Sequence, residues 1–93
     1  MRTGKISNGF EYAIEDNNLN NYLLLKDLAA VEGGNPGRIV NVTSRLLGEE
    51  QENRLIEHVA SLNDGNVPVD VMVNSIREIF EDIQLKNSSS SPA

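Results

Sequence analysis

The chain has 93 residues, of which 14 are Asp or Glu, 8 are Lys or Arg and none is Cys, and its net charge is −6. This length predicts one domain with a thin core, and the missing cysteines exclude disulfides and thiolate chemistry. Scattered bases in an acidic chain argue against binding to nucleic acid or anionic membranes. Since no apolar run approaches a membrane span or a signal peptide, we expect a cytoplasmic protein.

A β-hairpin is predicted over residues 1–16. Strand-prone segments at residues 3–7 and 10–15 flank Asn8-Gly9, a dipeptide typical of the type I′ turn, in which both central residues take positive φ. Two strands alone are marginal in water, so the hairpin must pack on helices or pair with another chain. An open strand edge would offer one route to self-association.

The first predicted helix covers residues 17–32, with Asn17 or Asn18 as its cap and Gly33 just beyond its end. Between residues 19 and 31, apolar side chains are distributed around nearly the whole circumference, whereas an ordinary amphipathic helix confines them to one face. Such a helix is either enclosed by protein or presents a surface to a partner.

Three more helices are predicted after the glycine-rich residues 33–37. Residues 36–47 follow a proline start and end at Gly48, and residues 49–62 open with acidic side chains that suit a helix N-terminus. Residues 68–86 carry a narrow apolar stripe. The members of this stripe are Val69, Met72, Val73, Ile76, Ile79, Phe80 and Ile83.

The Ser-rich residues 87–93 are expected to form a disordered tail. Residues 1–86 are predicted to be a single domain. The predicted fold class is mainly α, with a short N-terminal β-hairpin over residues 1–16 followed by a small four-helix domain over residues 17–86.

Reactive side chains are few in this sequence. His58 is the only histidine, and Arg54 and Leu62 occupy the positions one helical turn away where a second metal ligand would be needed. The glycine-rich residues 33–37 follow a helix and lack the Lys-Ser or Lys-Thr pair of a phosphate-binding loop. We therefore predict no catalytic residue, no metal site and no cofactor, and we expect that the protein is not an enzyme.

The helix that is apolar all round favours protein binding. Narrow stripes on the other three helices cannot cover its whole circumference, so a strip should remain open to a partner. The predicted partner-binding residues are Leu24, Leu25, Leu28 and Val31. The acidic surface favours a basic or amphipathic helix as the partner. The competing interpretation is an ordinary central core helix.

Short motifs in a fixed order add a resemblance to a known family. The motifs are NGFEY at residues 8–12, NYLLL at 21–25, LLGEEQ at 46–51, VPV at 67–69 and EIF at 78–80. Taken in this order, they resemble the small tail assembly chaperones of long-tailed (siphovirus-type) bacteriophages and prophages. The likeness spans residues 8–85.

This resemblance implies a noncatalytic role. Such chaperones coat the hydrophobic, helical tape measure protein, keep it soluble, help bring tail tube subunits to it, and are absent from the mature virion. The resemblance also implies a helical protein that forms homo-oligomers in the cytoplasm of the bacterial host. Two other classes share the composition: a small acidic protein-binding adaptor or inhibitor, and a structural virion subunit that uses the hairpin edge for assembly.

Overall fold

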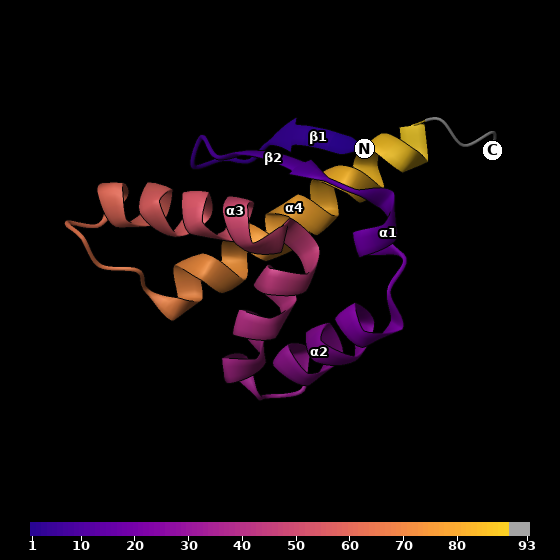
Figure 1. Cartoon of the computed structure of the whole chain (residues 1–93), viewed down its shortest axis with the longest axis horizontal. Helices are drawn as coiled ribbons and strands as arrows, with labels where there is room; N and C mark the ends of the chain where they lie inside the picture. The colour runs from indigo at the N-terminus through magenta and orange to yellow at the C-terminus, as the bar shows by residue number, and fades with distance from the viewer. Residues whose placement is uncertain (90–93) are drawn as a thin grey trace.

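A two-stranded hairpin followed by four α-helices makes up the fold (Figure 1), which confirms the predicted mainly α class. The structure is a computed structural model that describes the backbone of residues 1–89 and the side chains of residues 1–85. In chain order, the elements are β1 (Arg2–Lys5), β2 (Glu11–Ile14), α1 (Asp16–Leu19), α2 (Tyr22–Glu32), the 3₁₀ turn η1 (Pro36–Arg38), α3 (Ile39–Leu62) and α4 (Val69–Ser89). Within residues 1–89, no helix is both long and apolar enough to cross a membrane.

The turn of the hairpin differs from the predicted one. Of the turn residues, which the structure describes in full, only Gly9 takes positive φ (φ 92°), whereas a type I′ turn would also need it at Asn8. The Gly9 N–H donates to the Ile6 carbonyl at 3.0 Å, so Ser7 and Asn8 form the centre of the turn and Gly9 follows as a bulge. The Asn8 side chain favours this geometry, because its Oδ1 accepts from the Phe10 N–H at 3.0 Å. The predicted type I′ turn is therefore wrong.

The hairpin lies against α3 and α4 (Figure 1). Its buried apolar side chains are Ile6, Phe10, Tyr12 and Ile14. Polar contacts hold its tip as well, since Ser7 donates through its N–H at 3.2 Å and its Oγ at 2.9 Å to the Glu78 carboxylate. The hairpin thus packs on helices, which is one of the two arrangements predicted for it.

The predicted helix over residues 17–32 is interrupted between α1 and α2. Asn21 caps α2, since its Oδ1 accepts from the Leu23 N–H at 3.0 Å. Neither of the two predicted asparagine caps is used: α1 has no side-chain cap, and Asn18 Nδ2 donates instead to the Leu46 carbonyl of α3 at 3.1 Å. Several asparagines precede α2, and the one adjacent to the longer helix becomes its cap.

Helix α3 bends at Gly48, where the sequence predicted a helix end. Gly48 has φ 79° and ψ 163°, which is not helical, so residues 39–47 and 49–62 form two limbs that point in different directions (Figure 1). The Ser44 Oγ donates to the Glu52 Oε1 at 2.9 Å across the bend. The two predicted helices are therefore present, joined end to end at an angle.

The core lies between the hairpin and the helices. Its largest fully buried apolar side chains are Ile14, Leu24, Leu46, Leu55, Ile76 and Ile79. The stripe predicted for the last helix is buried at Met72, Ile76, Ile79 and Ile83, whereas Val69 at the start of α4 is exposed. Helix α4 runs to Ser89, beyond the predicted end at residue 86, and residues 90–93 of the predicted tail lie outside the described residues.

Candidate protein-binding site

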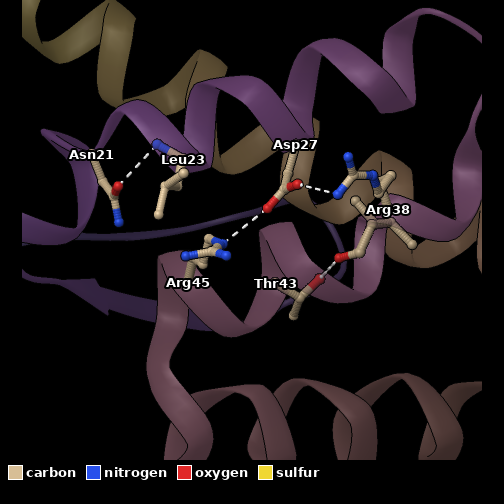
Figure 2. A network of polar contacts seen from close by, with 7 residues as sticks. Asn21, Leu23, Asp27, Arg38, Thr43 and Arg45 are labelled. Carbon is tan, nitrogen blue, oxygen red and sulfur yellow. Dashed lines mark hydrogen bonds and ion pairs between the residues drawn. The ribbon is translucent and has the colours of Figure 1, made fainter.

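A buried carboxylate fixes which side of α2 faces the core. The two oxygens of Asp27 accept from Arg38 Nη1 at 2.8 Å and from Arg45 Nε at 2.9 Å (Figure 2). Arg38 ends η1 and Arg45 belongs to the first limb of α3, so the two ion pairs hold α2 against η1 and that limb. A buried carboxylate without such partners would be strongly destabilising. The Asp27 side of α2 is therefore held inward.

The inward side of α2 also carries Leu24 and Val31, which are both buried. These two residues and Asp27 follow the spacing of three to four residues that defines one helix face. Leu24 has no exposed surface (0%), so in this conformation it is a core residue and offers no contact to a partner, contrary to its predicted role. Because a charged residue on the same face is buried, the sequence pattern alone did not identify this face as the inner one.

The opposite side of α2 is open to solvent. Tyr22 and Leu25 are 79% and 57% exposed, and their spacing of three residues places them on one side of the helix. The prediction that neighbouring helices leave part of this segment uncovered is therefore confirmed.

An apolar groove of about 300 Å³ opens between α2 and α4. We call it the α2–α4 groove, and its apolar walls are formed by Leu25, Leu28 and Val31 of α2 and by Val73, Ile76 and Phe80 of α4. The groove stays open because α2 packs on α3 and η1 and approaches α4 less closely. It brings together three of the four predicted partner-binding residues.

The rim of the α2–α4 groove is polar. Arg77 Nη2 donates to the Glu32 Oε1 at 3.1 Å, and this ion pair joins the two walls. Glu81 and Gln84 are exposed and line the α4 wall. Apolar walls with a polar rim are the usual anatomy of a surface that binds protein.

The sequence did not identify the α4 wall as part of a binding site. Val73 and Phe80 were assigned to the inward stripe of the last helix, yet both are only partly buried. Their position at the edge of the stripe, next to the polar residues Arg77 and Gln84, was the available signal. Which neighbouring helix leaves that edge uncovered depends on tertiary packing.

The histidine has a structural partner. His58 Nε2 donates to the Asn8 carbonyl at 2.8 Å, and its ring lies 6.0 Å from the ring of Phe10. Among the side chains that the structure describes, no three His, Asp or Glu residues lie close enough together to hold a metal ion. His58 therefore connects α3 to the hairpin tip.

Comparisons with protein-family models, curated proteins and solved structures find no match for this chain. Its function is therefore inferred from its own surface. The α2–α4 groove combines apolar walls, a polar rim and three residues assigned to partner binding from the sequence, so it is the candidate binding site.

Proposed function

We propose that this protein is a noncatalytic phage tail assembly chaperone, which binds hydrophobic helical segments of the tape measure protein and keeps that protein soluble during tail assembly. The observation that carries the proposal is the α2–α4 groove, because its apolar walls open to solvent beside the exposed Leu25. The resemblance of the sequence motifs to tail assembly chaperones supplies the identity of the client.

The α2–α4 groove has room for side chains of a client helix. Its volume of about 300 Å³ is about twice that of the roughly 150 Å³ cavity that holds one benzene, so it accepts about two apolar side chains. Full burial of one Leu or Phe side chain contributes about 1.5–3 kcal/mol. Together with the covering of Leu25 and Tyr22, this supports a reversible interaction after the entropic costs of association.

The charge of the chain suits a chaperone with an aggregation-prone client. With a net charge of −6, copies of the chain and of its complexes repel one another, which keeps them in solution. Under this proposal, the chaperone acts in the cytoplasm of the bacterial host, contacts tail tube subunits as well, forms a homo-oligomer, and is absent from the mature virion. Neither nucleic acid nor a membrane is a partner.

Co-expression with a candidate tape measure protein tests the proposal. The client should remain soluble with the wild-type chain and precipitate without it. Leu25→Asp should abolish this effect, whereas Leu62→Asp should retain it, because Leu62 lies outside the groove and is equally exposed (58% against 57%). Equal precipitation of the client with and without the wild-type chain would overturn the proposal.

Two further measurements separate the chaperone from the other protein-binding classes. Proteomics of purified particles should find none of this chain, and its presence in stoichiometric amounts would identify a structural virion subunit. If the chain leaves the tape measure protein insoluble but inhibits another bound protein, an acidic adaptor or inhibitor is the correct class.

A further inference from the structure

The ionisable side chains at the α2–α4 groove do not balance one another. Glu32 and Arg77 neutralise each other through their ion pair at 3.1 Å. Glu81 is exposed on the α4 wall and has no ion pair among the side chains that the structure describes. One negative charge is therefore left at the edge of the groove.

A second copy that met this groove with its own groove would not complement that charge. Arg77 is the only base among the described residues that line the groove, and it is already engaged by Glu32. Each copy has a net charge of −6, so two copies that met at their grooves would place acidic surfaces against each other, which disfavours association. The charge pattern therefore calls for a different polypeptide that brings a base.

The shape of the α2–α4 groove fits one helix. The α4 wall extends from Val73 to Gln84, which is about 16 Å at about 1.5 Å per residue and matches about three turns of a partner helix. Because both walls are helices, apolar side chains on one face of a third helix, at positions i, i+3, i+4 and i+7, can enter between them.

We infer, on the basis of the proposed function, that the α2–α4 groove binds a single basic amphipathic helix of the client. The apolar face of this helix lies between α2 and α4, and one of its Lys or Arg side chains pairs with Glu81. The apolar contact supplies affinity, and Glu81 selects the charge and the register of the bound segment. Acidic amphipathic helices bind more weakly.

Two synthetic helical peptides test this inference with the full chain. Both peptides carry leucines at positions i, i+3, i+4 and i+7, and they differ only in having Lys or Glu at the flanking positions. The Lys peptide should bind about fivefold to tenfold more tightly at low salt, and the difference should shrink at high salt. Equal affinities of the two peptides at low salt would overturn the inference.

Charge reversal at Glu81 tests whether this residue sets the preference for the Lys peptide. Glu81→Lys should reverse the preference, so that the Glu peptide binds more tightly than the Lys peptide. Glu57→Lys is the matched control, because it changes the net charge equally at an exposed position of α3 outside the groove, and it should retain the preference for the Lys peptide. Equal changes in both variants would show that net charge alone sets the preference, which would overturn the inference.

The location and stoichiometry of the complex complete the test. Titration of the ¹⁵N-labelled chain with the Lys peptide should shift the amide signals of Leu25, Leu28, Val73 and Phe80, and shifts confined to the hairpin would overturn the inference. Sedimentation should show that one peptide binds to each chain. If the chain instead forms a dimer that Leu25→Asp dissociates, a second copy occupies the groove, and the inference would also be overturned. The proposed function fails separately, if the tape measure protein precipitates despite the wild-type chain.

Discussion

The side-chain amide of Gln51 bonds both backbone groups of Ala13. Its Oε1 accepts from the Ala13 N–H at 2.8 Å, and its Nε2 donates to the Ala13 carbonyl. Ala13 belongs to β2 and lies opposite Thr3 of β1, and its backbone groups bond Gln51 of α3. Gln51 therefore occupies the position beside β2 that a third strand would take. Open strand edges are templates for pairing with other chains, and Gln51 covers part of this one.

Gln51→Ala should therefore destabilise the fold and uncover the edge of β2. The loss of two hydrogen bonds should lower the free energy of unfolding by about 1–3 kcal/mol, measured by urea unfolding. Size-exclusion chromatography at increasing concentration should also show more association than in the wild type. Asn53→Ala, at an exposed position of α3, is the control and should change stability by no more than about 0.5 kcal/mol.

Leu24 and Leu25 are neighbours in the sequence with opposite environments, since Leu24 is 0% and Leu25 is 57% exposed. Leu24→Asp places a charge in the core and should cost about 4 kcal/mol or more. Leu25→Asp should change stability by no more than about 1 kcal/mol while it abolishes client solubilisation. Thermal unfolding and the co-expression assay measure the two effects. A stable Leu24→Asp variant would contradict the orientation of α2.

Gly48→Ala should destabilise the bend of α3. Its φ of 79° and ψ of 163° lie in a region that is essentially restricted to glycine, so the variant should lose about 1–3 kcal/mol. A Cβ at this position would meet no atom within 4 Å, so the cost comes from the backbone alone. Urea unfolding provides the measurement.

Gly37→Ala is the matched control for the bend. Gly37 does not have positive φ, and its Cβ would make only an ordinary contact, 3.7 Å from Asn35 Oδ1. This variant should be neutral or more stable by about 0.4–1 kcal/mol, because alanine restricts the unfolded chain. Equal losses in both variants would show that the conformation of Gly48 is not the cause.

Tyr12 should make stability depend on pH in the alkaline range. Burial raises the pKa of Tyr12 above its usual value, and the hydrogen bond to Asp82 and the charge of Asp82 raise it further. The folded chain thus keeps a proton that the unfolded chain releases above about pH 10. This contribution to stability is complete below about pH 10 and is lost as the pH rises towards the folded pKa.

Urea unfolding between about pH 8 and pH 11 checks this dependence. The wild type should lose stability more steeply with rising pH than Tyr12→Phe, which has no phenol at this site. Tyr22→Phe removes a hydroxyl at an exposed position and should follow the wild-type curve. Parallel curves for Tyr12→Phe and the wild type would contradict the role of Tyr12.

Local signals in the sequence identified the hairpin and most helix ends. Gly48 was identified as a helix end because glycine readily adopts the positive φ at which a helix ends, and the structure has such a φ at this residue. Asn8 and Gly9 located the hairpin but not its turn type, since the side chain of Asn8 bonds the backbone in a way that a dipeptide pattern does not specify. The cap of α2 was also misplaced, because several asparagines in a row offer equivalent local signals.

The orientation of α2, and with it the binding site, was not predictable from local patterns. A charged residue normally marks the solvent side of a helix, yet Asp27 is buried because Arg38 and Arg45, 11 and 18 residues further along the chain, reach its carboxylate. This long-range pairing turns Leu25 outward. The position of α2 beside Val73 and Phe80, at the edge of the apolar stripe of α4, also depends on the tertiary fold.

The bend at Gly48 shapes a surface that it does not touch. The first limb of α3 begins with Ile39, which also lines the groove, and carries Arg45, which binds Asp27 of α2. The direction that the bend gives this limb therefore sets where α2 lies relative to α4. In a saturation scan scored by client rescue, substitutions at Gly48 would therefore group with those at the groove, although no side chain stands there to meet a client. Such a scan would show that client binding depends on the backbone conformation at Gly48 as well as on the apolar side chains that line the groove.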